Sequence, residues 1–276
     1  MNIITTVNRR GGVGKTVTAH AIGAGLAHLG NKVLFIDLDS QSNLSYDLAA
    51  NMDGYSAMDL LTREAPADSI IQHKGKWDVI PASPSLATAD AVITATGKEY
   101  RLKEALEPIA ALYDYCIVDT PPALNTLTVN ALTAATGAII PAQAEIHSLQ
   151  GVGLLYETIE QVRRYCNRDL LIYGILLTRY SGRAILSKDM KSNLEAAADQ
   201  LGTKVYSTPI RESITIKEAQ ASQQDIFTYA IRSNAAKDYT AVIAELMSQK
   251  PETCYELIKD AVQYDKSNLK KSKREE

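Results

Sequence analysis

The sequence is poor in cysteine, and its histidines do not cluster. Three cysteines, Cys116, Cys166 and Cys254, stand far apart among 276 residues, which argues against a disulfide framework or a set of metal-binding thiols. The four histidines are scattered as well, so a catalytic zinc is not expected. The scattered cysteines also disfavour an iron–sulfur cluster shared between two subunits.

The sequence also lacks long apolar runs and a strong charge of either sign. No stretch of about 18 consecutive apolar residues occurs, and the start Met1-Asn2-Ile3-Ile4 has no charged leader, so we expect a cytoplasmic protein without membrane attachment. The 29 basic and 32 acidic residues leave a net charge of −3, so any contact with nucleic acid must be local. With 46% hydrophobic residues the chain can bury one α/β core, which we expect over residues 1–250.

A glycine-rich run follows the first apolar stretch and precedes a helical pattern. It reads Arg9-Arg10-Gly11-Gly12-Val13-Gly14-Lys15-Thr16. Glycines let several backbone N–H groups turn toward one point, and the positive end of the following helix faces that point. The run predicts a polyphosphate-binding loop, with the Lys15 ammonium on the β and γ phosphates and the Thr16 hydroxyl on magnesium. The residues expected to contact the nucleotide are Gly11, Gly12, Val13, Gly14, Lys15, Thr16 and Val17.

Short β-branched runs alternate with longer helical patterns along the chain. The predicted strands are Ile3–Val7, Val33–Asp37, Trp77–Pro81, Tyr115–Asp119, Ala138–Pro141, Leu170–Leu177 and Val205–Thr208. Uninterrupted apolar runs such as Cys116-Ile117-Val118 are typical of strands covered on both faces. The predicted fold is therefore α/β, a doubly wound and mostly parallel sheet flanked by helices.

Carboxylates emerge at the ends of two predicted strands. Asp37 and Asp39 follow the second strand, and Asp119 ends the strand that begins at Tyr115. Ligands of doubly wound folds bind beyond the carboxyl ends of strands, where all these motifs fall. Taken alone, Asp37 and Asp39 could instead cap a helix in a solvated turn. Downstream of a phosphate loop, a nucleotide site is favoured.

These motifs resemble those of the ParA/MinD-type ATPases, whose deviant Walker A loop reads Asn-x-Lys-Gly-Gly-x-Gly-Lys-Thr. Asn8 is present here, whereas Arg10 replaces the signature lysine. Later segments that resemble the family are Asp37–Asn43, Asn130–Leu132 and Pro141–Gly151. The likeness spans most of residues 1–160 and is looser from Leu170 onward.

The resemblance implies a P-loop ATPase that uses ATP and Mg²⁺. The implied catalytic residues are Lys15, Asp39 as the water-activating group, and Arg10. The implied metal-site residues are Thr16, Asp37 and Asp119. Pro209 and Arg211 stand where the family builds its base pocket, which makes them candidates for contacts with adenine.

The family also implies partners. Its members form a homodimer in the ATP state, bind DNA nonspecifically and act with a centromere-binding ParB-type partner, so the protein would associate with the nucleoid when ATP is bound. An alternative is a nucleotide-gated regulatory or interaction protein with weak or no hydrolysis, as in MinD-like positioning or transcriptional regulation. Arg10 leaves two hypotheses open: an arginine finger that supports slow turnover, or a fork that stabilises a long-lived ATP dimer.

Two further segments carry expectations about binding. The basic residues between 179 and 237 are Arg179, Arg183, Lys188, Lys191, Lys204, Arg211, Lys217, Arg232 and Lys237. They suit DNA phosphates, or they are ordinary solvated charges interspersed with acids.

The C-terminal segment is expected to pack on the protein itself. Over residues 251–264 we predict a helix that packs on the body rather than on a membrane, because its apolar face lacks Phe and Trp. Over residues 265–276 we predict a basic flexible tail.

Overall fold

The computed structural model describes residues 1–181, 185–200 and 202–275, and its centre is one seven-stranded sheet. The strands are β1 (Asn2–Thr6), β2 (Val33–Asp37), β3 (Gln72–Lys74), β4 (Trp77–Ile80), β5 (Tyr115–Asp119), β6 (Gly137–Gln143) and β7 (Leu171–Thr178). Their order is β3-β4-β2-β5-β1-β6-β7, and all neighbours are parallel except β3 and β4. The predicted fold class is confirmed.

One predicted strand was wrong, and one observed strand was not predicted. Val205–Thr208 is not a strand: Val205 makes only an isolated bridge to Ile175. No strand pairing continues beyond this bridge in the described residues that follow, because the Ser207 N–H donates to Glu245 Oε2 instead (3.0 Å). Pro209 has no N–H with which to pair. The short antiparallel edge strand β3 was not predicted, since three residues are too few to show a period of two.

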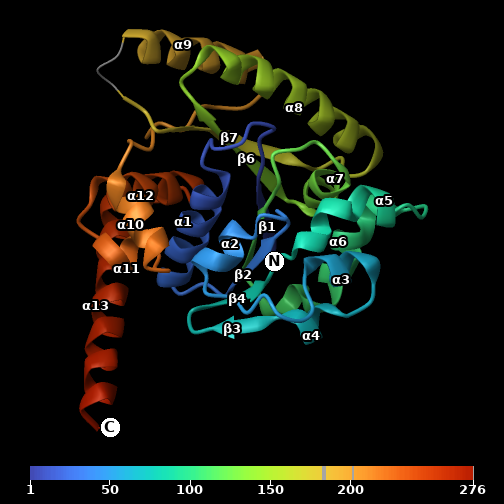
Figure 1. Cartoon of the computed structure of the whole chain (residues 1–276). Coiled ribbons are helices and arrows are strands. Elements are labelled where there is room, and N and C mark those ends of the chain that lie inside the picture. The colour runs from blue at the N-terminus through green and yellow to red at the C-terminus, as the bar shows by residue number, and fades with distance from the viewer. Residues whose placement is uncertain (182–184, 201, 276) are drawn as a thin grey trace.

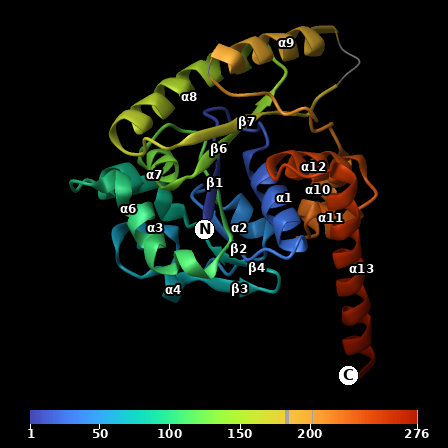
Figure 2. The same cartoon turned by 180° about the vertical axis from the view of Figure 1, so that it is seen from behind.

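Helices cover both faces of the sheet (Figures 1 and 2). One face carries α1 (Lys15–His28), α10 (Ile214–Ala221), α11 (Ile226–Ala230), α12 (Asn234–Leu246) and α13 (Pro251–Glu275). The other carries α3 (Ala57–Thr62), α4 (Ala67–Ile70), α5 (Ala89–Val92), α6 (Arg101–Leu106), α7 (Thr126–Ala134), α8 (Ile146–Tyr165) and α9 (Ile185–Gln200). The short helix α2 (Asn43–Asp47) follows β2, and 3₁₀ turns lie at Pro84–Thr88, Lys98–Tyr100 and Glu107–Leu112.

Alternating side chains of the central strands pack into hydrophobic cores on the two faces of the sheet. In β2, Val33 and Phe35 pack with α1, α11 and α12, whereas Leu34 and Ile36 pack with the helices of the opposite face. Helix α1 lies close to the sheet because Gly23 has no side chain: a Cβ there would lie 2.3 Å from the Phe35 ring. The helix that follows the phosphate loop is therefore held firmly against the strands that deliver the carboxylates.

The C-terminal helix α13 packs on the body at its start and then extends away from it (Figures 1 and 2). Cys254, Ile258 and Val262 recur at helical spacing and are buried. The helical backbone continues to Glu275, past residue 264, where the sequence analysis expected the helix to end. Within the described residues, we find no helix with the length and apolar character required to span a bilayer.

Candidate nucleotide-binding site

A pocket of about 470 Å³ opens beyond the carboxyl ends of the central strands. Predicted residues that line it are Gly11, Gly12, Gly14, Lys15, Thr16, Val17, Asp39 and Arg211. Others lie elsewhere: Val13, Asp37 and Asp119 are buried behind the wall. Of the described residues around position 210, Ile210 and Arg211 line the pocket but Pro209 does not.

The ends of β6 and β7 fix the phosphate loop in place. Gln143 Nε2 donates to the carbonyl of Gly12 (3.1 Å), and Thr178 Oγ1 donates to the carbonyl of Val13 (2.7 Å). Gly12 and Gly14 have φ angles of 75° and 88°, in the left-handed region that favours glycine. The loop shape is therefore set by its own glycines and by two polar side chains from neighbouring strands.

Lys15 lies at the base of the pocket with only 7% of its surface exposed. Its Nζ donates to the carbonyl of Arg10 (3.2 Å). Burial lowers the pKa of Lys15, and the charges of Asp119 and Asp39 oppose that shift. A buried ammonium beside a phosphate loop is a strong electrostatic partner for a bound anion.

Two carboxylates face each other at the ends of adjacent strands. Asp37 on β2 is the register partner of Asp119 on β5, and both are fully buried. Asp119 accepts hydrogen bonds from the Thr16 hydroxyl (2.6 Å) and the Thr6 hydroxyl (3.1 Å). Burial raises the pKa of both acids; the charge of Asp37 adds to the shift of Asp119, whereas hydrogen bonds from Ser45 oppose the shift of Asp37.

This set of oxygen donors suits a divalent cation. Buried carboxylates with raised pKa gain from a nearby positive charge, and the hydroxyl of Thr16 already contacts one of them. Of the three residues named from the sequence, Thr16 is hydrogen-bonded to Asp119, and Asp37 is the register neighbour of Asp119.

Asp39 differs from these two acids because it lines the pocket. Its backbone N–H donates to Asp37 Oδ1 (3.0 Å), and its own Oδ1 accepts from the Gln41 N–H (3.1 Å). The carboxylate is thus held by the backbone on the pocket side of the buried pair. A carboxylate so placed can orient a water molecule beside a bound phosphate.

Arg10 is not among the residues that line the pocket; it pairs with Glu145. Its Nη2 lies 2.6 Å from Glu145 Oε2, and both side chains are partly exposed. Asn8 organises the same corner: its Oδ1 accepts from the Arg10 N–H (3.0 Å) and its Nδ2 donates to the Pro141 carbonyl (2.7 Å). Sequence reasoning noted the Pro141–Gly151 stretch but missed that Glu145 pairs with Arg10, a contact that no local pattern signals.

The far wall of the pocket comes from the segment after β7 and from α10. Arg211 is held by Asp238 through Nε (2.9 Å) and Nη2 (2.5 Å). Arg179, with a left-handed φ of 48°, also lines the wall. Gln41 and Asn43 line the pocket from within the Asp37–Asn43 segment that resembles the family. Lining residues outside the predicted contacts are Pro122, Glu212, Ser213, Ile216, Gln220 and Tyr239. Of this wall, the family resemblance had indicated Arg211, which lines the pocket.

The described basic residues of positions 179–237 have different surroundings. Arg179, Arg211 and Lys217 line the pocket. Lys204 pairs with Glu245 (2.7 Å) and Lys191 with Glu195 (3.6 Å). Arg183 and the side chain of Lys188 lie outside the described residues.

Comparisons with known proteins agree with this geometry. A family model described as an AAA domain matches residues 1–172. The chain is 37% identical to the sporulation initiation inhibitor protein Soj of Bacillus subtilis, over 88% of this chain and 97% of that protein. It is 36% identical to the chromosome-partitioning ATPase Soj of Thermus thermophilus, over 90% and 96%.

A solved structure shares both the fold and part of the sequence. The structure of cobyrinic acid a,c-diamide synthase from Mycobacterium smegmatis, with bound ATP analog and magnesium, superposes with a TM-score of 0.73 at 32% identity. The match covers 81% of this chain and 93% of that one. The present chain therefore belongs to the ParA-type family of P-loop ATPases.

Proposed function

We propose that this protein is a magnesium-dependent ATPase that dimerises with ATP bound, binds DNA without sequence preference in that state and drives DNA segregation. One observation carries the nucleotide part: a fixed phosphate loop, Lys15 and Asp39 share a pocket in front of two buried carboxylates. The likeness to a chromosome-partitioning ATPase supports the segregation part. The partners would be a second copy of this chain, DNA and a centromere-binding ParB-type protein.

The residues of the site divide the work of phosphoryl transfer. Lys15 and the loop N–H groups bind the β and γ phosphates, and Asp39 orients the attacking water. Thr16, Asp37 and Asp119 would hold Mg²⁺, which neutralises phosphate charge when it is bound. Because positioning and charge stabilisation dominate such reactions, the backbone bonds that fix Asp39 matter more than its basicity.

Turnover of Asp39→Ala tests the assignment. We expect the variant to bind ATP with nearly wild-type affinity but to hydrolyse it roughly 10²–10³-fold more slowly, the range found when one transition-state contact is removed. Phosphate release and equilibrium binding of a non-hydrolysable ATP analogue measure the two steps. Unchanged turnover in the variant would remove Asp39 from catalysis; absence of ATP binding in the wild type would refute the nucleotide part altogether.

DNA binding is tested separately. If only the ATP-bound dimer binds DNA, the affinity for DNA should require ATP. Because lysine and arginine would contact DNA phosphates, that affinity should be indifferent to sequence and fall steeply with salt. Electrophoretic mobility at several salt concentrations, with and without ATP, measures this. Equal binding without nucleotide would contradict the switch. A small DNA-binding protein encoded beside this one would be the first candidate for the partner that accelerates hydrolysis.

A second candidate function is a nucleotide-gated regulatory protein with little or no hydrolysis. The observation that favours it is Arg10, which stands at the signature position and pairs with Glu145. If the guanidinium supports hydrolysis, Arg10→Lys should change turnover; if it stabilises only the ATP dimer, Arg10→Lys should change the dimer lifetime. Equal turnover and equal dimerisation of both proteins would remove Arg10 from the mechanism.

A further inference from the structure

Helix α2 lies between the Asp39 loop and the wall of the nucleotide pocket. It spans only five residues, Asn43–Asp47. Its flanks are strained, because Ser42 (φ 55°) and Ala49 (φ 50°) are non-glycine residues with left-handed backbone. So short a helix has little stability of its own. Its position therefore depends on bonds to the rest of the protein.

Hydrogen bonds tie α2 to the buried carboxylates. The N–H and the hydroxyl of Ser45 both donate to Asp37 Oδ2, each at 2.8 Å. The other oxygen of Asp37 accepts the Asp39 N–H at 3.0 Å. A displacement of α2 is thus transmitted to the backbone of Asp39 through a single carboxylate.

The end of α2 is tied to helix α10. Gln220 Nε2 donates to Asp47 Oδ2 (2.8 Å), and Gln223 Nε2 donates to the carbonyl of Tyr46 (2.8 Å). Asp47 is only 4% exposed, and its nearest ring nitrogen, His20 Nδ1, lies 4.0 Å away, beyond hydrogen-bonding range. The amide of Gln220 is therefore the hydrogen-bond donor that satisfies this buried acid.

Gln220 also belongs to the pocket. It lines the nucleotide site one helical turn from Ile216, on the wall opposite the phosphate loop. The same side chain thus faces the ligand space and contacts α2. A hydrogen bond joins Gln220 to Asp47, the backbone of α2 joins Asp47 to Ser45, and hydrogen bonds to Asp37 join Ser45 to the N–H of Asp39.

We propose that Asp47 and Gln220 are positioning residues that couple filling of the nucleotide pocket to the placement of Asp39. A nucleotide seated against α10 restrains Gln220, which holds α2 through Asp47, and α2 in turn holds the Asp39 loop through Ser45. The inference rests on the proposed ATP hydrolysis at this site, and it assigns a role to two residues that lie outside the phosphate loop.

Substitutions at position 47 separate positioning from folding. Asp47→Ala removes the acceptor, and we expect the maximal rate of ATP hydrolysis to fall by about tenfold while affinity for a non-hydrolysable ATP analogue changes by less than about twofold. Asp47→Asn keeps an oxygen that accepts the Gln220 amide, so it should retain most of the rate. Gln220→Ala should resemble Asp47→Ala, and the double variant should be no slower than either single one.

The matched control is Ser222→Ala. Ser222 follows α10 directly, and its hydroxyl donates only locally, to the Glu218 carbonyl (2.9 Å), so its loss should leave turnover unchanged. The proposal is overturned if Asp47→Asn is as slow as Asp47→Ala, if the single effects add in the double variant, or if the lost rate matches a lost fraction of folded protein in thermal unfolding.

Amide hydrogen exchange without nucleotide gives a reading that does not depend on hydrolysis. In Asp47→Ala the Ser45 amide should exchange faster, whereas amides of α12 should exchange as in the wild type. Unchanged Ser45 exchange would refute the bridge even if ATP turnover is real. Faster Ser45 exchange in a protein that fails to bind the ATP analogue would refute the proposed ATPase and leave the mechanical link intact.

Discussion

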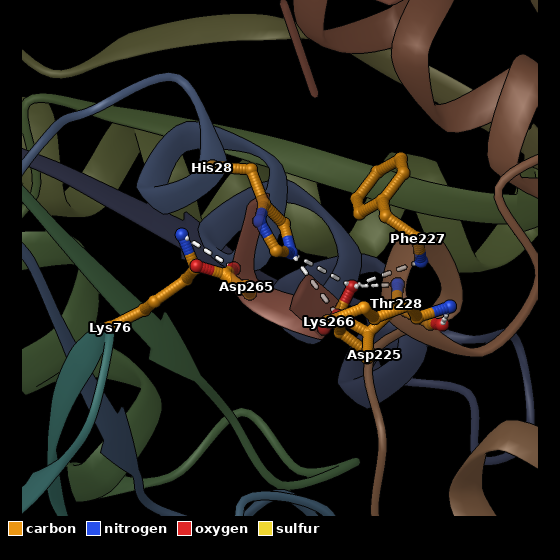
Figure 3. Close-up of polar contacts among 7 residues, drawn as sticks. All are labelled: His28, Lys76, Asp225, Phe227, Thr228, Asp265 and Lys266. Carbon is orange, nitrogen blue, oxygen red and sulfur yellow. Dashed lines mark hydrogen bonds and ion pairs between the residues drawn. The ribbon is translucent and has the colours of Figure 1, made fainter. Parts of the chain in front are cut away.

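Two buried acidic centres lie at opposite ends of helix α1, and they are satisfied in opposite ways. At its start, Thr16 contacts Asp119, whose register partner is Asp37. At its end, His28 Nε2 lies 3.2 Å from Asp225 Oδ1, and the same oxygen accepts the N–H groups of Phe227 and Thr228 (Figure 3). The centre at the start of α1 places two acids side by side, whereas the centre at its end pairs one acid with hydrogen-bond donors.

The pKa directions express this contrast. Burial raises the pKa of Asp37 and Asp119, and no neighbouring donor fully compensates among the described residues. Burial alone would also raise the pKa of Asp225, but the hydrogen bond and charge of His28 and the hydrogen bonds from Thr228 outweigh it and lower the pKa to about 2. A buried acid with a raised pKa is stabilised in its charged form by a nearby cation, so it is suited to bind one. A buried acid whose charge is already stabilised by hydrogen bonds and a neighbouring charge contributes to the stability of the fold.

Asp119→Asn should give the largest effect on function. It removes a carboxylate from the proposed magnesium site, and we expect ATP turnover to fall by roughly 10²–10³-fold. Stability should not fall with it, because a buried acid with raised pKa is replaced by a neutral side chain. Steady-state turnover and the melting temperature without nucleotide measure both effects.

The stabilising effect of Mg²⁺ and ATP provides the control for this variant. A ligand that binds the folded state raises the melting temperature, so wild-type protein should gain stability from Mg²⁺ with an ATP analogue. Asp119→Asn should lose most of the magnesium-dependent part. If the variant is markedly less stable than the wild type without ligands, then Asp119 is a structural acid like Asp225 and the contrast fails.

Asp225→Asn should give the largest effect on stability. Breaking a buried pair by altering one partner typically costs about 3–5 kcal/mol, and Asp225 also caps α11. We expect a loss of about 3 kcal/mol in the free energy of unfolding, measured with urea. Turnover per folded molecule should remain at the wild-type level. A variant with normal stability and impaired turnover would reverse the roles of the two centres.

The pH dependence of the Asp225 effect should have a definite sign. The folded-state pKa, about 2, lies below the ordinary value of 3.8, so the folded state binds fewer protons than the unfolded state between these values. The stabilisation by Asp225 is therefore complete above about pH 5 and is lost as pH falls toward 2. The wild type and Asp225→Asn should converge over that window by about 2 kcal/mol. A gap that widens in acid would contradict the assignment.

The sequence was most informative where function is local in the chain. The phosphate loop and the strand ends that carry Asp37, Asp39 and Asp119 were predictable, because glycine spacing and apolar runs are short-range patterns. The structure places Lys15 and Asp39 in one pocket as expected. The family assignment, made from the same motifs, is confirmed by relatives that match along most of the chain.

Contacts between distant segments could not be predicted. Gln220 bonds to Asp47 across 173 positions of sequence, and His28 meets Asp225 across 197. Neither pair leaves a periodic signal, since the first depends on how α10 meets α2 and the second on how α11 packs against α1. Pro209 was assigned to the base pocket by analogy, whereas its neighbours Ile210 and Arg211 line the pocket. The turn that carries them is set by bonds to β7, not by local preference.

The smallest predicted effect concerns the surface contacts that join α13 to the Asp225 centre and to the turn between β3 and β4. Lys266 Nζ donates to the Thr228 carbonyl (2.7 Å), and Asp265 pairs with Lys76 (2.9 Å) (Figure 3). Both contacts are partly exposed, so Lys266→Ala should cost less than about 1 kcal/mol. Its effect should be local: faster amide exchange in α13 beyond Val262, with ATP turnover and the melting temperature nearly unchanged. A loss as large as that of Asp225→Asn would mean that α13 supports the buried pair, and that the structural centre extends to the surface of the protein.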